Sequence, residues 1–167
     1  MKYRTSLGTT AILITVFLTL LFGSAISFLI YRAVMSTEIV EMVIILCIGL
    51  FILTLYLLSF SYRPMFYILN SENIIVRRPA KDVIIPICEI KDAFLVRKES
   101  MTWTERIGGN GGLFGFYGNF KNSFGVMTWY TTRLNNYLMI ETVANDRFVL
   151  TPDDKDMVKE IRKLIGK

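Results

Sequence analysis

The chain has 167 residues, of which 53% are hydrophobic, and this is a high share for a protein that is soluble throughout. Nineteen lysine and arginine residues against 14 acidic ones give a net charge of +5, and these charges are spread along the chain without forming a basic stripe. This distribution argues against nucleic-acid binding, and the sequence contains no histidine, the commonest catalytic base.

Two apolar stretches near the start of the chain predict a membrane hairpin. They cover about residues 7–31 and 40–60, and a short polar segment around Arg32 and Glu38 separates them. A helix of about 20 apolar residues crosses a hydrocarbon core of about 30 Å, so each stretch is long enough to span it. We therefore expect residues 1–61 to form a transmembrane helical hairpin and residues 62–167 to form one domain outside the bilayer.

The charges that flank the two stretches predict the orientation. The connecting segment offers Arg32 against Glu38 and Glu41, whereas the outer flanks carry Lys2, Arg4, Arg63, Arg77 and Arg78. Because cytoplasmic flanks are enriched in lysine and arginine, we expect both termini and the domain to be cytoplasmic. The alternative is a cleavable signal peptide over residues 2–25, and the second stretch would then still leave the rest of the chain inside.

Residues 62–150 read as β-structure. Short β-rich runs are separated by polar turn clusters, and the runs are residues 65–69, 73–78, 83–85, 93–97, 126–132, 137–143 and 147–150. About seven regularly spaced strands with turn signals indicate an antiparallel sandwich or barrel. We expect such a sheet structure to need a cover at its open end.

The C-terminal segment carries the clearest helix signals. Thr151 is placed as the N-cap, and Pro152 occupies the first turn. Apolar residues then recur at three- and four-residue spacing, namely Met157, Val158, Ile161, Leu164 and Ile165. We expect this stripe to pack on the sheet. The competing interpretation is a helix on the membrane surface, with its lysine and arginine residues facing anionic lipid.

Residues 106–120 form a glycine-aromatic segment, with glycines three residues apart at positions 109, 112, 115 and 118. The segment matches neither a dinucleotide fingerprint nor a phosphate-binding loop. We expect a long loop that folds over the sheet and is held by its aromatic side chains. The alternative is a partner- or ligand-binding loop, for which the candidate residues are Gly109, Gly112, Phe114, Gly115, Phe116 and Tyr117.

The order of these pieces resembles bacterial pleckstrin-homology-like (PH-like) domains. Residues 67–78, YILNSENIIVRR, and 83–90, VIIPICEI, are similar to the opening strands of that family. Residues 106–120, RIGGNGGLFGFYGNF, then 129–132 and 148–152, FVLTP, are similar to its later half. The resemblance implies a bent β-sandwich or barrel of about seven strands capped by a C-terminal helix, in a member anchored by two N-terminal transmembrane helices.

The resemblance implies an interaction module in the bacterial cytoplasmic membrane. No catalytic, cofactor-binding or metal-binding residues are assigned, and we expect a non-enzymatic scaffold that binds a protein partner or a second copy of itself. The alternative is a sensor of anionic lipid surfaces, which would use Arg77, Arg78 and Lys81 as weak headgroup candidates. The turn at residues 70–73 carries no cation, unlike the lipid-binding hairpins of many eukaryotic PH domains.

Overall fold

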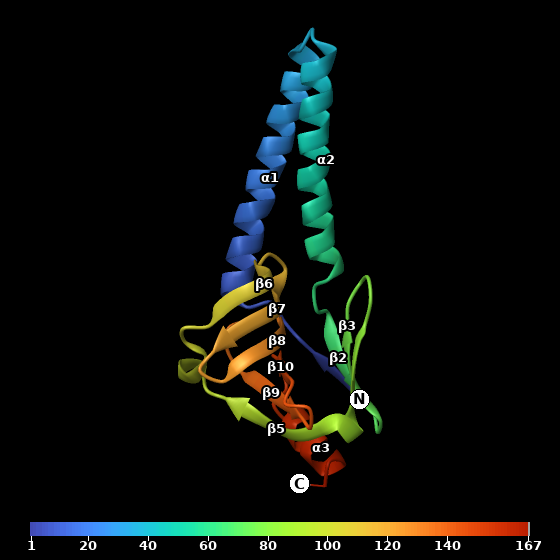
Figure 1. The fold of residues 1–167 in the computed structure, drawn as a ribbon, viewed down its shortest axis with the longest axis vertical. Helices are drawn as coiled ribbons and strands as arrows, with labels where there is room; N and C mark the ends of the chain where they lie inside the picture. Colours follow the sequence, from blue (N-terminus) through green and yellow to red (C-terminus); the bar gives the residue numbers. More distant parts are fainter. Residues whose placement is uncertain (167) are drawn as a thin grey trace.

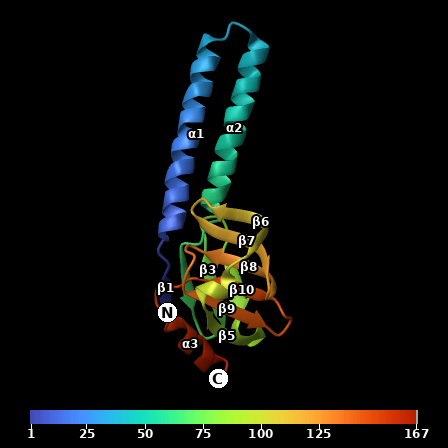
Figure 2. The same ribbon diagram turned by 90° about the vertical axis from the view of Figure 1, so that its left-hand side faces the viewer.

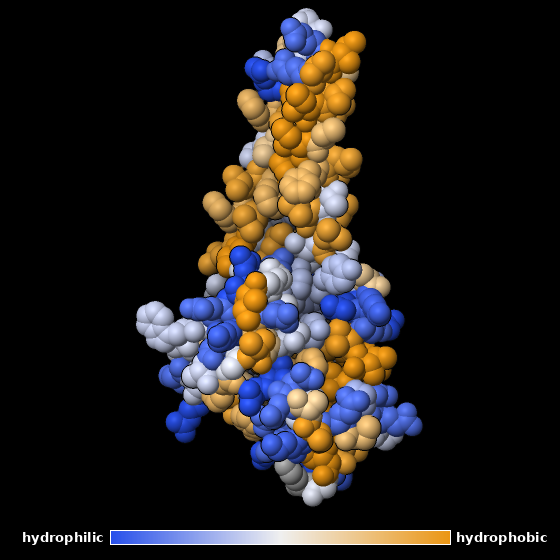
Figure 3. Space-filling view, in the orientation of Figure 1, coloured by the Kyte–Doolittle hydropathy of each residue, from blue (hydrophilic) through white to orange (hydrophobic). Residues whose placement is uncertain are grey.

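The computed structural model describes residues 1–166 and arranges them as a long helical hairpin above a β-rich domain (Figure 1). Helix α1 (Thr9–Met35) and helix α2 (Ile39–Ser61) form the hairpin. Both are long and apolar enough to cross a membrane, and their outer surface is largely hydrophobic (Figure 3). Within these two helices only Ala11 and Ile45 are buried, so the apolar side chains point outward.

Polar contacts close the far end of the hairpin. Arg32 Nη2 lies 2.6 Å from Glu41 Oε1, and Ser36 Oγ donates to Glu41 Oε2 at 2.9 Å. The charged groups of the connecting segment therefore lie together at the tip, outside the apolar length of the helices. Because this ion pair is exposed, it contributes at most about 1 kcal/mol to stability.

The first sheet has four antiparallel strands in the order β1-β2-β3-β4. They are β1 (Lys2–Arg4), β2 (Phe66–Leu69), β3 (Asn73–Arg77) and β4 (Val83–Pro86). Alternate residues of β2 and β3 point into the core, as the period of two predicts. Tyr3 of β1 pairs with Tyr67 of β2. Residues 2–4 therefore lie in this sheet, although both helices separate them from β2 in the sequence.

The second sheet has six strands in the order β5-β9-β10-β8-β7-β6. They are β5 (Ile90–Val96), β6 (Glu105–Gly112), β7 (Gly115–Asn122), β8 (Gly125–Thr131), β9 (Tyr137–Thr142) and β10 (Arg147–Leu150). Strand β10 lies between β8 and β9 and runs parallel to β8, whereas the other neighbours are antiparallel. Two short 3₁₀ segments, η1 (Ile87–Glu89) and η2 (Lys98–Met101), flank β5.

All seven predicted runs form strands, and the described chain adds three more, β1, β6 and β7. The predicted fold class is confirmed: two N-terminal apolar helices precede a mainly-β domain that ends in a C-terminal helix. In both views the β6–β7 end of the second sheet lies next to the helices, and α3 lies at the opposite end of the domain (Figures 1 and 2).

The second sheet carries hydrophobic clusters on both faces. One cluster packs against the first sheet and includes Tyr67, Ile74, Leu138, Ile140 and Leu150. The other face carries mainly aromatic and sulfur-containing side chains, together with Ala11 from the base of α1. Strand β9 contributes to both clusters through a continuous apolar run, which is typical of a strand that is covered on both sides.

Tyr67 links the two sheets. Its ring is fully buried, and its hydroxyl donates to the carbonyl oxygen of Tyr130 at 2.6 Å and accepts from the Thr151 amide at 3.1 Å. Burial raises the pKa of this phenol, so it stays protonated and able to donate. Because an unsatisfied buried group costs about 1–3 kcal/mol, both contacts help to hold the sandwich closed.

The C-terminal helix α3 (Met157–Leu164) is shorter than predicted. Thr151 is not its N-cap: the buried Thr151 hydroxyl accepts from the Thr132 amide at 3.0 Å, and this contact ties residue 151 to the second sheet. Asp156 is the residue before the helix instead. The prediction that the apolar stripe packs on the sheet is confirmed for Met157, Val158 and Ile161, which are buried in the core, and for Ile165, which packs against it. Leu164 is exposed, so the prediction was wrong for this member of the stripe.

Candidate functional site

The glycine-aromatic segment forms a β-hairpin and not the long loop that we expected. Strands β6 and β7 pair from Glu105↔Lys121 to Gly112↔Gly115, and Leu113 and Phe114 make the connecting turn. Phe114 adopts a φ of +61°, which the tight turn requires. The glycines conceal the strands in the sequence because a residue without a side chain shows no alternation of apolar and polar groups.

The three-residue spacing of the glycines produces two facing pairs. Gly109 lies opposite Gly118, and Gly112 lies opposite Gly115, symmetrically about the turn. All four have positive φ, and a Cβ on Gly109 would lie 2.3 Å from the Tyr117 carbonyl oxygen. Two backbones therefore approach more closely in this hairpin than side chains would allow.

The tip of the hairpin contacts α1. The Phe114 amide donates to Thr15 Oγ1 at 2.9 Å, and a Cβ on Gly112 would lie 2.6 Å from Ile14 Cδ1. The backbone of the tip therefore lies directly against the first helix, in space that a side chain at position 112 would fill.

The ring of Phe114 contacts α2. Its centroid lies 5.3 Å from that of Tyr56 and 5.4 Å from that of Phe60, and both pairs have edge-to-face geometry. The Arg63 guanidinium is 4.1 Å from the Phe60 ring centre, which adds a cation–π contact at the helix end. Phe114 thus bridges the two helices where they meet the domain.

Tyr117 provides a further connection to α2. Its hydroxyl donates to the Ser59 carbonyl oxygen at 2.5 Å and accepts from Asn110 Nδ2 at 3.0 Å. Burial raises the pKa of this phenol, and its hydrogen bonds offset part of the rise. The neutral hydroxyl therefore satisfies a carbonyl oxygen in the last turn of α2, where no further backbone donor follows in the helix.

Five of the six partner-binding candidates are buried within the chain. Gly112, Phe114, Gly115, Phe116 and Tyr117 are buried, although Phe116 and Tyr117 each line a pocket, whereas Gly109 is exposed on β6. The side chains of Phe114 and Tyr117 contact the helices, and Phe116 joins the aromatic cluster on the second sheet. A partner in the present conformation would reach the backbone of β6, but not these aromatic rings.

Beside the hairpin lies a groove of about 610 Å³, between the end of α2 and the strands β6, β7 and β8. Its walls include Tyr62, Arg78, Gly109 and Tyr130. The Arg78 guanidinium lies 5.4 Å from the Tyr62 ring centre and 5.5 Å from that of Tyr130, and its Nε donates to the Lys81 carbonyl oxygen at 2.6 Å. The groove thus offers one cation between two aromatic rings.

The three headgroup candidates have different environments. Arg77 forms an ion pair with Asp82, Lys81 is exposed, and Arg78 alone lines the groove. Among residues 1–166 no group of three or more histidine, cysteine or acidic side chains is close enough to hold a metal ion. The arrangement offers apolar surface, backbone groups and a cation, which is the chemistry of binding.

A family model for the bacterial PH domain matches residues 65–164, and its span covers α3 and every described strand except β1. The chain belongs to the bacterial PH domain family. The predicted resemblance is therefore confirmed. No curated protein and no solved structure matches the chain.

The contacts between the PH domain and the hairpin were not predicted from the sequence. The sequence shows the contacting helix residues only as members of apolar spans. In the structure the β6–β7 hairpin contacts Thr15, Tyr56 and Ser59. One signal was present: glycines at equal distances on both sides of residues 113 and 114 are typical of a hairpin with a two-residue turn. The apolar turn residues obscured it, because turns are usually polar.

Proposed function

We propose that this protein is a non-enzymatic, membrane-anchored interaction protein whose PH domain binds a protein partner or a second copy of the chain. The proposal rests on the contacts between the β6–β7 hairpin and both helices, which involve Thr15, Ser59 and Phe114. These contacts hold the domain against the anchor in one orientation. A fixed orientation suits a scaffold, because it presents the same surface of the domain to every partner in the membrane.

We further propose that the domain lies on the cytoplasmic side of the bacterial inner membrane. The flanking basic residues support this orientation. Thiol labelling tests this orientation, because both cysteines of the chain are free. Cys88 lies on the domain, and Cys47 lies within α2. A membrane-impermeant maleimide should label Cys88 in inside-out vesicles and leave it unlabelled in intact cells. Labelling of Cys88 in intact cells would reverse the proposed orientation.

The free edge of β6 is the surface that we assign to the protein partner. This strand ends the second sheet, and its exposed residues include Arg106, Ile107 and Gly109. An edge strand presents unpaired backbone groups to which another strand can add. The buried members of the candidate set, such as Phe114 and Tyr117, would then contribute indirectly, because they hold β6 in position.

Site-specific photocrosslinking in native membranes tests this surface. A photoreactive residue replaces Ile107, which is 59% exposed, and in a matched control it replaces Val143, which is 72% exposed in the turn between β9 and β10. We expect a discrete protein adduct, a partner or a dimer, from position 107 and not from position 143. Equal adducts from both positions, or lipid adducts alone, would contradict the assignment.

A second candidate function is recognition of anionic lipid, and the position of Arg78 favours it. This guanidinium lines the groove at the end of α2, where a headgroup would lie if α2 spans the bilayer. In the full chain, Arg78→Gln should lower the retention of phosphatidylglycerol from mixed micelles, as measured by native mass spectrometry. Arg77→Gln is the matched control, since Arg77 already pairs with Asp82. Equal retention by both variants would eliminate this function.

A further inference from the structure

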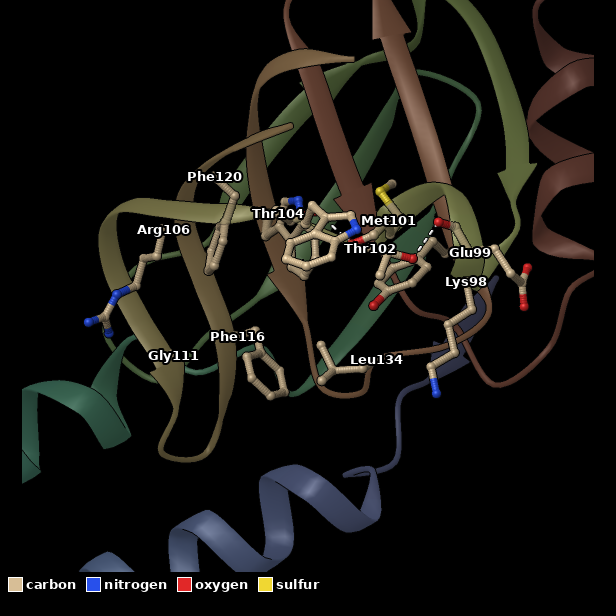
Figure 4. A pocket seen from close by; sticks show the side chains of 13 residues that line it. Lys98, Glu99, Met101, Thr102, Thr104, Arg106, Gly111, Phe116, Phe120 and Leu134 are labelled. Atoms are coloured by element: carbon tan, nitrogen blue, oxygen red, sulfur yellow. Dashed lines mark hydrogen bonds between the residues drawn. The ribbon is translucent and has the colours of Figure 1, made fainter. Parts of the chain in front are cut away.

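A second, separate cavity of about 710 Å³ lies on the face of the second sheet that points away from the first sheet. Segment η2 and the following residues to Thr104 form one side, and β6, β7 and β8 form the other. In Figure 4 the side chains of Phe116, Phe120 and Leu134 point toward the interior of this cavity, whereas the charged ends of Lys98, Glu99 and Arg106 lie at its periphery.

Aromatic rings make the cavity wall. The Trp129 ring is stacked on that of Phe120, with centroids 4.5 Å apart and planes at 24°. Tyr137 lies on another side of the same indole, 5.4 Å away and tilted by 51°. Met101 is 5% exposed and adds a polarizable thioether. Cavities of this size and chemistry are typical of sites for small apolar ligands.

Two hydrogen-bond donors in this wall have no acceptor. Trp129 Nε1 is buried and lacks a hydrogen-bond partner within the described part of the chain. The Tyr137 hydroxyl also makes no hydrogen bond to residues 1–166, but unlike Trp129 Nε1 it is not fully enclosed. Burial of the side chain raises its pKa to about 12, so it carries its proton at neutral pH and can donate. Buried donors are rarely left unpaired in folded proteins, so Trp129 Nε1 points to an acceptor that the described part of the chain does not supply, and the Tyr137 hydroxyl lies on the same indole as a second available donor.

The hydrophobic cluster that backs the cavity reaches the base of the membrane hairpin. Ala11 of α1 belongs to the same hydrophobic cluster as Trp129 and Tyr137, and Ile14 packs against that cluster. Phe116 lies in β7, two residues beyond the tip that contacts α1 and α2. The cavity therefore lies on the side of the sheet that adjoins the domain-proximal end of α1.

We propose that this cavity binds an apolar molecule from the membrane through a neutral carbonyl oxygen, which accepts hydrogen bonds from Trp129 and Tyr137. A pure hydrocarbon would leave both donors unpaired. A carboxylate would bring a full charge among aromatic rings with no buried cation beside it, at a much higher cost. Two membrane sources share the required chemistry, aliphatic acyl compounds and ring-bound ketones such as quinones.

Indole resonances of the full ¹⁵N-labelled chain in detergent micelles test the proposal. The sequence has two tryptophans, and Trp103→Phe identifies the second indole resonance, because Trp103 also lines the cavity although it is 92% exposed. The probes are methyl decanoate for the aliphatic source, a decyl-substituted benzoquinone for the ring source, and undecane as a hydrocarbon without an acceptor. We expect the Trp129 indole proton to shift downfield with at least one carbonyl probe and to stay in place with undecane.

Variants measure the contribution of the donors. Trp129→Phe keeps a ring against Phe120 but has no N–H, so the affinity for the active carbonyl probe, followed through the Met101 methyl resonance, should fall by about tenfold. Tyr62→Phe, at an exposed position that does not line this cavity, should not change it. Tyr137→Phe removes the second donor and provides the test if Trp129→Phe does not fold, which the Met127 methyl resonance reports.

The probes identify the source and also define failure. A response to methyl decanoate alone assigns an acyl ligand, a response to the benzoquinone alone assigns a ring-bound carbonyl, and a response to both supports the shared chemistry. The proposal is overturned if the Trp129 indole resonance moves with no carbonyl probe, or if undecane binds as tightly as the carbonyl probes. Unchanged affinity in both Trp129→Phe and Tyr137→Phe would overturn it as well.

Discussion

Replacing Gly112 with alanine should separate the β6–β7 hairpin from the first helix. The new Cβ would lie 2.6 Å from Ile14 Cδ1 and 3.1 Å from Ile14 Cγ2, and position 112 has a φ of +136°. A non-glycine residue in that backbone region costs roughly 1–3 kcal/mol. Overpacking against the branched side chain adds roughly 1–3 kcal/mol. We therefore expect a loss of about 2–6 kcal/mol in the contact between the PH domain and its anchor.

Gly108→Ala is the matched control on the same strand. A Cβ on Gly108 would meet no atom within 4 Å, and the φ of Gly108 is not positive. We expect Gly108→Ala to change the stability by less than about 1 kcal/mol, because alanine is at least as favourable as glycine in a strand.

Thermal unfolding in micelles measures the effect, since about 1 kcal/mol shifts the midpoint by roughly 2–4 °C in a chain of this size. Gly112→Ala should therefore lower the midpoint by roughly 4–24 °C. Its local effect is read from amide hydrogen exchange at Phe114, whose N–H is bonded to Thr15. If the two glycine variants show the same midpoint and the same Phe114 exchange, the tip does not depend on the close approach to α1.

Three further substitutions test other parts of the fold, each by unfolding in micelles. Tyr67→Phe removes the hydroxyl that joins the two sheets and should lower the free energy of unfolding by about 1–3 kcal/mol. Tyr62→Phe, at an exposed position, should lower it by almost nothing. Equal losses in the two variants would contradict the linking role of Tyr67. Met157→Ala empties a fully buried site and should cost about 2–5 kcal/mol, against little for the exposed Met65→Ala; a loss below about 1 kcal/mol at Met157 would contradict the packing of α3. The pKa of Tyr137 is about 12 in the folded protein and about 10 in the unfolded chain, so its contribution is complete below pH 10 and is lost as the pH rises to 12. Between about pH 10 and about pH 12 the free energy of unfolding should fall by about 2–3 kcal/mol less in Tyr137→Phe than in the natural protein. Parallel pH profiles of the two proteins would show that this phenol is not buried.

The hydrophobic pattern alone was enough to predict the two-helix hairpin and seven of the strands. The spans are uniform apolar runs, and the β2 and β3 residues alternate between core and surface in step with their apolar pattern. The C-terminal stripe likewise located the buried face of α3. In each case one local feature, burial at a fixed period, determined the structure.

The elements that were not predicted depend on contacts distant in sequence. Strand β1 has three residues, too few for a pattern, and it forms because β2 offers a free edge to Tyr3. Half of the eight residues of strand β6 are glycines, and its turn is apolar because Phe114 lies against the helices. Thr151 has the residue type of a helix cap, but buried partners in the sheet use its hydrogen-bonding groups instead.

The pairing of β1 with β2 has a consequence for how the protein is made. The two strands are separated by both helices, so this edge of the sheet cannot close until about 60 residues of hairpin have been synthesised between them. If the helices insert into the bilayer as they emerge, the first strand waits at the membrane surface for its neighbour, and completion of the domain becomes a checkpoint on correct insertion. A fragment that starts at residue 62 would lack this strand and expose the β2 edge, which favours aggregation.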